Sequence, residues 1–116
     1  VVMHHTCGSV RQLIPLMIER GLDVLQSLQP EAVGMDARAL KREFGDRLAF
    51  HGGISIQRTL PFGSPAQVHD EVRDRFAALA PGGGYIACTA HNIQADVPLE
   101  NVLALLEAYR QCGAYR

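Results

Sequence analysis

The chain has 116 residues, of which 47% are hydrophobic and 20% charged, and its formal net charge is −1. A nearly neutral chain has no long-range field that would attract nucleic acid or an anionic membrane, so we expect neither as a partner. The sequence contains no apolar run of about 18 residues, which argues against a membrane-spanning helix. Its three cysteines are widely spaced and are not a disulfide framework, so we expect a cytoplasmic location.

The first predicted strand–helix unit starts at the beginning of the chain. Residues 1–5 form a short apolar run typical of a buried strand, and because the chain starts inside it we expect further residues upstream. Gly8-Ser9 opens a helix that Gly21 ends. Pro15 removes one backbone donor, and we expect it to bend the first turns. The apolar residues of this helix recur at helical period: Val10, Leu13, Ile14, Met17 and Ile18.

The second unit has a predicted strand over residues 22–28, followed by a loop around Gln29-Pro30. Asp36 can accept a hydrogen bond from the first turn of a helix over residues 37–44. Gly45 is expected to end that helix. The sequence thus predicts a second strand followed by a second helix.

The third and fourth units follow the same order. A strand over residues 47–51 runs into Gly52-Gly53 and a loop of about ten residues rich in Pro and Gly. Ser64, Pro65 and Gln67 then form a helix start with a capping box, and the helix runs to about residue 80. A strand over residues 85–89 precedes the last helix, which Pro98 opens. We expect its inner face to carry Val102, Leu105, Leu106 and Tyr109.

Strands that alternate with helices and are apolar on both faces predict a parallel α/β sheet with right-handed crossovers. Dividing 116 residues among four units gives about 29 residues for each, close to the roughly 30 of a (β/α)₈ barrel. An open four-stranded sheet would leave two apolar edges unpaired. We therefore predict one domain over residues 1–116, made of four consecutive βα units that form half of a TIM barrel.

Polar side chains gather after the predicted strands, where parallel α/β folds place their active sites. Four of the five histidines lie there. His5 and Cys7 are two residues apart and would point to the same side of an extended strand, so both could bind one metal ion. Thiolate with imidazole suits zinc, and His91 is the natural third ligand. The alternative is a buried cysteine beside a hydrogen-bonded histidine.

His51-Gly52-Gly53 forms a second candidate segment. Glycine permits close approach of the backbone, so the N–H groups here could contact a ligand. The same residues would equally suit a tight turn that leaves the strand. The segment is therefore a candidate for substrate binding without being specific for it.

Several segments together resemble the uroporphyrinogen decarboxylase superfamily, which also contains cobalamin-dependent methyltransferases. The resemblance covers essentially the whole chain and implies a (β/α)₈ barrel, of which this chain would be the C-terminal half, strands 5–8 with their helices. The segments are residues 5–10 (HTCGSV), 41–45 (KREFG), 50–54 (FHGGI), 91–94 (HNIQ) and 97–102 (VPLENV).

The two branches of that superfamily imply different chemistry. In the methyltransferase branch a His-x-Cys pair and a later residue bind zinc, which activates a thiol acceptor. His5 and Cys7 match the pair, and His91 stands where the third ligand is usually cysteine. In the decarboxylase branch the position of His91 contacts substrate, no metal is needed, and the His-x-Cys pair is not usual. The resemblance also implies that His91 is catalytic. We further expect His51, Gly52, Gly53, Gln57 and Asn92, which follow the third and fourth predicted strands, to contact substrate.

We therefore expect the parent protein to be an enzyme that performs zinc-dependent methyl transfer involving a corrinoid, with decarboxylation in tetrapyrrole synthesis as the alternative. Its partners would be a small-molecule substrate or a corrinoid protein. A third alternative is a half-barrel that is inactive alone and pairs through its edges with a missing N-terminal half or a second copy. A flavodoxin-like corrinoid or flavin module is disfavoured, because no Asp-x-His-x-x-Gly loop follows the first strand.

Overall fold

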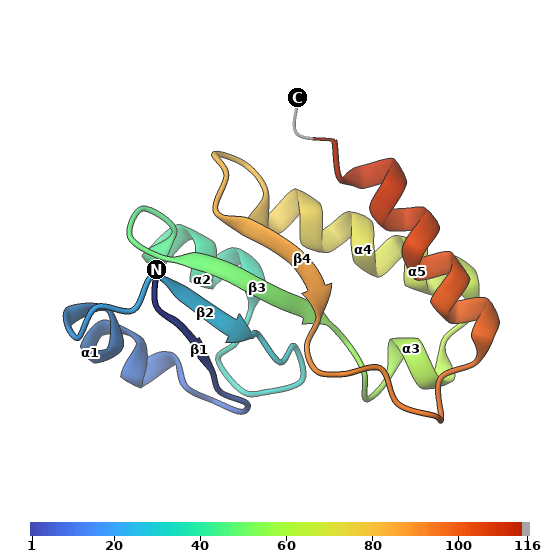
Figure 1. Cartoon of the computed structure of the whole chain (residues 1–116), viewed down its shortest axis with the longest axis horizontal. Helices are drawn as coiled ribbons and strands as arrows, with labels where there is room; N and C mark the ends of the chain where they lie inside the picture. The colour runs from blue at the N-terminus through green and yellow to red at the C-terminus, as the bar shows by residue number, and fades with distance from the viewer. Residues whose placement is uncertain (115–116) are drawn as a thin grey trace.

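The computed structural model describes residues 1–114 and contains one parallel sheet with the strand order β1-β2-β3-β4 (Figure 1). The strands are β1 (Met3–His5), β2 (Val24–Ser27), β3 (Ala49–Ile54) and β4 (Tyr85–Thr89). The helices that follow them are α1 (Ile14–Glu19), α2 (Ala37–Phe44), α4 (Pro65–Leu79) and α5 (Leu99–Cys112). The predicted α/β architecture of four consecutive βα units is confirmed, and it is consistent with half of a TIM barrel.

Two helix starts form as the sequence predicts. The Asp36 carboxylate accepts a hydrogen bond of 2.8 Å from the backbone N–H of Ala39, and α2 ends at Gly45. At the start of α4, the Ser64 hydroxyl accepts from the Gln67 N–H while the Gln67 side chain accepts from the Ser64 N–H. Both arrangements satisfy N–H groups that have no partner within the helix.

The first helix differs from its prediction. Residues Arg11–Leu13 form a short 3₁₀ helix, and α1 begins only at Ile14. Pro15 therefore lies in the first turn, where its missing N–H would have had no partner within the helix, so it starts the helix instead of bending it. The predicted apolar stripe is wrong at Leu13, which is exposed while Ile14 is buried.

The region after the third strand also differs. Gly52 and Gly53 continue β3 with positive φ angles, so the alternative of a tight turn leaving the strand is wrong. Their neighbours on β4, Ala87 and Cys88, keep them in the sheet. A short helix α3 (Thr59–Phe62) lies within the segment expected to be a loop.

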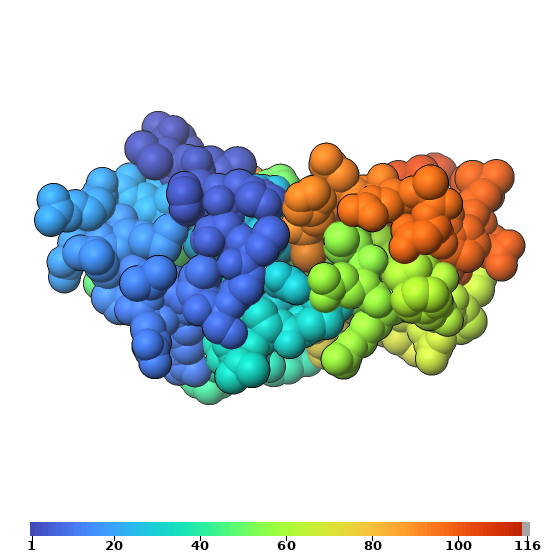
Figure 2. Space-filling model, turned by 90° about the horizontal axis from the view of Figure 1, so that it is seen from below, coloured from blue at the N-terminus to red at the C-terminus, as the bar shows by residue number. Residues whose placement is uncertain are grey.

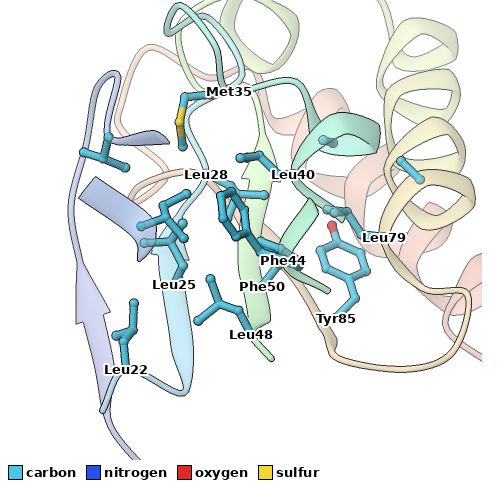
Figure 3. Packing of buried hydrophobic residues seen from close by; sticks show 14 residues of the cluster. Leu22, Leu25, Leu28, Met35, Leu40, Phe44, Leu48, Phe50, Leu79 and Tyr85 are labelled. Atoms are coloured by element: carbon cyan, nitrogen blue, oxygen red, sulfur yellow. The ribbon is translucent and has the colours of Figure 1, made fainter. Parts of the chain in front are cut away.

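Two apolar clusters pack against the outer face of the sheet. The larger cluster joins the sheet to α1, α2 and α4, with Leu25, Leu40, Phe50 and Leu79 at its centre (Figure 3). The smaller one joins the end of β3 to α3, α4 and α5. On α5 Leu105 is buried, as expected, but Leu106 is 53% exposed because it points away from this cluster. None of the helices in residues 1–114 is long and apolar enough to cross a membrane.

Within residues 1–114, no helix lies across the other face of the sheet. In Figure 1 the helices α2 and α4 lie behind the strands, while the near face of the sheet is uncovered. The strand register places His5, Gln26, His51 and Ile86 side by side on one face, because paired residues of parallel strands point the same way. Ile86 is 46% exposed, so this face is the uncovered one.

Candidate active site at the carboxyl ends of the strands

The segments that follow all four strands meet at one end of the sheet. Figure 2 views the molecule from below and shows these segments side by side, in blue, cyan, green and orange in chain order. They enclose an open hollow of about 240 Å³. The hollow is lined by Cys7, Ser27, Gln29, Ile56, Gln57, Ala90, His91 and Gln94.

The predicted His5–Cys7 pair is brought together at the rim of this hollow. The Cys7 Sγ lies 3.4 Å from Nε2 of His5, and both side chains are on exposed residues. On the far side of the ring, His5 Nδ1 is hydrogen-bonded to the Gln26 side-chain oxygen. An amide oxygen can only accept, so Nδ1 carries a proton, and in the neutral ring Nε2 then presents a lone pair toward the sulfur. The alternative of a buried cysteine is wrong, because Cys7 is exposed.

Ser27, the last residue of β2, connects the pair to the segment after β4. Its hydroxyl donates to the backbone oxygen of Ala90 at 2.9 Å and lies 3.5 Å from Cys7 Sγ. Ser27 is 1% exposed, and its backbone φ is 107°, a conformation that residues other than glycine rarely adopt. The carboxyl end of β2 therefore contacts both the β1 and β4 sides of the hollow.

His91 lies next to the pair without completing a metal centre. Its ring packs edge-on against that of His5, with 5.4 Å between ring centroids. The Thr89 hydroxyl donates to the His91 backbone oxygen at 2.6 Å, which anchors the turn that carries the ring. Within residues 1–114, no group of three His, Cys, Asp or Glu side chains is arranged so that it could hold a metal ion.

Two of the three predicted ligands, His5 and Cys7, are placed as zinc ligands would be. Zinc–sulfur and zinc–nitrogen bonds of about 2.3 and 2.0 Å at a tetrahedral angle put the two ligand atoms about 3.5 Å apart. The Cys7–His5 separation of 3.4 Å is close to that distance. A ligating histidine usually donates its other ring N–H to an oxygen, which is what His5 does with Gln26. The pair thus suits zinc, whereas His91 would have to turn toward it.

Two glutamines line the side of the hollow between β1 and β3. Gln29 accepts a hydrogen bond from the Gly8 backbone N–H at 3.0 Å and donates to the Gln57 side-chain oxygen at 3.1 Å. Gln57, predicted to contact substrate, thus lies at the hollow with one acceptor already engaged. These amides supply hydrogen-bonding groups to a polar ligand without adding net charge.

A carboxylate-rich network supports the start of the segment after β3. The Ser55 N–H donates to Glu71 at 3.0 Å, its hydroxyl donates to Glu31, and Arg75 pairs with Glu71 at 3.4 Å. Arg75 also donates to the backbone oxygen of Gly53 at 2.8 Å. These contacts hold the end of β3 against α4 and against the loop that follows β2.

The remaining predicted substrate contacts lie outside the hollow. His51 is next to Gln26 on the uncovered face, and its Nδ1 is buried without a hydrogen-bond partner among the described residues. Gly52 and Gly53 are buried in β3, and Asn92 is exposed beyond the rim. A Cβ at Gly52 would lie 2.4 Å from the Ser27 backbone oxygen, so glycine is required there for packing. Their contact with substrate stays a prediction.

Sequence reasoning did not select Gln26, Ser27 or Gln29 as site residues. Ser27 is the last residue of β2 and Gln29 follows it closely, so both are polar residues at the end of an apolar strand, where polar side chains are expected to gather. Gln26 has no such signal, because it lies inside β2 and becomes relevant only through its register with His5. Knowledge of which strands pair, and in which register, was needed to find it.

Comparison with known proteins identifies the family. The family model described as uroporphyrinogen decarboxylase (URO-D) matches residues 1–112. The chain belongs to the uroporphyrinogen decarboxylase family. It is 29% identical over 99 residues to the uroporphyrinogen decarboxylase of Serratia proteamaculans (strain 568), which covers 81% of this chain and 27% of that protein.

Other relatives carry the same name. The uroporphyrinogen decarboxylase of Cronobacter sakazakii (strain ATCC BAA-894) is 27% identical over 97 residues, covering 80% of this chain and 27% of that protein. That of Sodalis glossinidius (strain morsitans) is 30% identical over 81 residues, covering 66% of this chain and 22% of that protein. The chain thus spans about a quarter of the length of the curated relatives that it matches.

Proposed function

We propose that this chain contributes one half of the active site of a URO-D family enzyme that catalyses zinc-dependent methyl transfer involving a corrinoid. The observation that supports this proposal most directly is the approach of Cys7 Sγ to His5 Nε2 at 3.4 Å, with Gln26 bound to the other ring nitrogen. A thiolate and an imidazole at this separation are the donors that zinc prefers.

In this proposal, some side chains of this chain bind the metal and others bind the substrate. His5 and Cys7 bind the metal, and His91 is the third ligand, after a rotation that brings its ring toward them. Gln29, Gln57 and Gln94 line the hollow and bind polar groups of the substrate. When bound, zinc supplies Lewis-acid activation of a thiol at neutral pH.

The rest of the barrel would come from outside these residues. We propose that the chain is the C-terminal half of the barrel, and that the N-terminal half completes the active site. A second copy could instead cover the open edges of the sheet, in which case the chain would be inactive alone. The cytoplasmic location and the corrinoid partner remain predictions of the same proposal.

Decarboxylation in tetrapyrrole synthesis is the second candidate function. The curated relatives are all named for that reaction, which is the observation that favours it. In this case His91 and the amides of the hollow would hold the substrate and steady a charged pyrrole intermediate, without a metal. An aspartate and arginines upstream of this chain would favour decarboxylation, and their absence would favour methyl transfer.

Metal analysis of the purified full-length protein tests the first candidate. We expect close to one zinc per protein, lost in His5→Ala and in Cys7→Ser because each removes one of the paired donors. His4→Ala is the matched control, since His4 is an exposed histidine of the same strand whose side chain points to the opposite face from that of His5, and zinc should be retained. A protein that contains no zinc and releases carbon dioxide from uroporphyrinogen in the presence of a chelator would replace methyl transfer with decarboxylation.

A further inference from the structure

Two consecutive residues at the end of β2 contact every segment that carries a candidate zinc ligand. Gln26 binds the His5 ring, and Ser27 contacts Cys7 and the residue that precedes His91. Neither is itself a metal donor of the proposed site. They lie behind the ligands, where they can set ligand orientation before a metal arrives.

Gln26 determines which nitrogen of His5 is free. Its side-chain oxygen accepts from Nδ1–H, so the neutral ring is held as the tautomer with an unprotonated Nε2. That nitrogen is the atom 3.4 Å from Cys7 Sγ. Without this acceptor the ring could exchange tautomers and rotate, because His5 is exposed and, among the described residues, its ring is otherwise held only by Cys7 and the edge-on contact with His91.

Ser27 joins the two sides of the site through one hydroxyl group. The hydroxyl donates to the Ala90 oxygen and lies within reach of the Cys7 sulfur, so a single group fixes the distance between the β1 and β4 segments. Its backbone has φ of 107°, and Leu28 follows with φ of 44°. Such conformations are strained in residues other than glycine and persist where the surroundings enforce them, often at functional sites.

The neighbouring strand is shaped to permit this conformation. Gly52 pairs with Ser27, and a side chain on Gly52 would lie 2.4 Å from the Ser27 backbone oxygen. The strained backbone conformation of Ser27 thus depends on a glycine at position 52 of β3. The position of the Ser27 hydroxyl, which contacts the segments after β1 and β4, therefore depends on Gly52 of β3.

We propose that Gln26 and Ser27 are the positioning residues of the site: Gln26 sets the tautomer of His5, and Ser27 sets the spacing between Cys7 and the His91 segment. The expected consequence, tighter zinc binding, rests on the zinc site of the proposed function. The strained conformation of Ser27 is retained because it places the hydroxyl between the two segments.

Zinc affinity of the full-length protein, measured by competition with a chelator, tests the consequence. Gln26→Leu and Ser27→Gly should each weaken zinc binding by about 10- to 100-fold, the usual effect of removing a partner of a metal ligand. Gln26→Glu keeps an acceptor for Nδ1–H and should bind within a few-fold of the original protein. Gln12→Leu changes an exposed glutamine away from the site and should have no effect.

Two further readouts separate positioning from mere stability. Ser27→Gly relieves the backbone strain, so its denaturation midpoint should not fall even though its zinc affinity does. The absorption spectrum of the cobalt-substituted protein should change in Ser27→Gly and Gln26→Leu and stay the same in Gln12→Leu. Equal zinc affinity and an unchanged cobalt spectrum in both variants would overturn the inference while leaving the zinc site intact.

The His5 tautomer can be measured without metal. Long-range ¹H–¹⁵N NMR spectra should show a proton on Nδ1 in the original protein and a mixture of tautomers in Gln26→Leu. If the protein binds no zinc but shows this difference, the proposed function fails and the positioning by Gln26 stands. If the original protein shows a proton on Nε2, the positioning by Gln26 is wrong, whether or not zinc binds.

Discussion

The two faces of the sheet contrast sharply, although adjacent residues supply them. Leu25 and Phe50 point toward the helices and are almost completely buried, whereas Gln26 and His51, the next residues along the same strands, lie on the uncovered face. The helix-covered face is apolar and its packing is complete within residues 1–114. The other face carries polar groups, one of which, Nδ1 of His51, has no hydrogen-bond partner among the described residues. The apolar core and the polar candidate residues Gln26 and His51 therefore lie on opposite sides of one sheet.

The largest expected effect tests this contrast directly in the 116-residue chain. Phe50→Ala removes a fully buried ring from the main cluster and should lower the free energy of unfolding by about 3–5 kcal/mol. Ile86→Ala on the uncovered face should cost less than about 1 kcal/mol, since the side chain is 46% exposed. Urea denaturation measures both. A cost for Ile86→Ala close to that of Phe50→Ala would show that a second copy of the chain covers that face.

A substitution at Gly52 tests the close packing of β3 against Ser27 at the end of β2. Gly52→Ala places a Cβ 2.4 Å from the Ser27 backbone oxygen and also strains a residue with φ of 113°, so it should cost at least about 2–3 kcal/mol. Gly21→Ala is the control, because Gly21 has a similar φ of 93° but nothing within 4 Å of the added atom. It should cost only about 1 kcal/mol. Equal costs, measured by thermal denaturation, would mean that strain alone matters and that the close approach to Ser27 does not.

The smallest expected effect compares two tyrosines behind the sheet. The Tyr85 hydroxyl donates to the Gly52 backbone oxygen at 3.0 Å, so Tyr85→Phe should cost about 1 kcal/mol. The Tyr109 hydroxyl is buried and has no hydrogen-bond partner among residues 1–114, so Tyr109→Phe should be neutral or slightly stabilising. A cost for Tyr109→Phe as large as that for Tyr85→Phe would contradict the structure.

Tyr109 also predicts a dependence on pH. Burial raises the pKa of its phenol well above the usual value of 10.0, with smaller contributions from nearby acidic groups. In the unfolded chain the phenol ionises near pH 10, while in the folded chain it stays neutral. Above about pH 10 the unfolded chain releases this proton and the folded chain keeps it, so unfolding becomes more favourable. The free energy of unfolding is therefore unaffected by Tyr109 below about pH 10 and falls as the pH rises beyond it. Tyr109→Phe should reduce this decline in the free energy of unfolding above pH 10, and an unchanged decline would place its origin elsewhere.

Local signals in the sequence predicted much of the fold. The caps at Asp36 and Ser64 and the bounds of α2 and β4 follow from interactions within a few residues, so they could be predicted without a structure. The predictions failed where neighbours in space decide the outcome. Gly52 and Gly53 stay in β3 because β4 pairs with them, and Leu106 is exposed because only one side of α5 packs against the molecule.

The candidate site divides in the same way. The sequence alone predicted that the side chains of His5 and Cys7 lie on the same side of the chain, and they do approach each other, although β1 ends at His5 and Cys7 lies two residues beyond it. Only the tertiary structure determined that Gln26 orients His5 and that Ser27 lies between Cys7 and Ala90. These contacts join residues 20 to 63 positions apart in the chain, and they depend on which strands pair and in which register, so they involve segments far apart in the sequence.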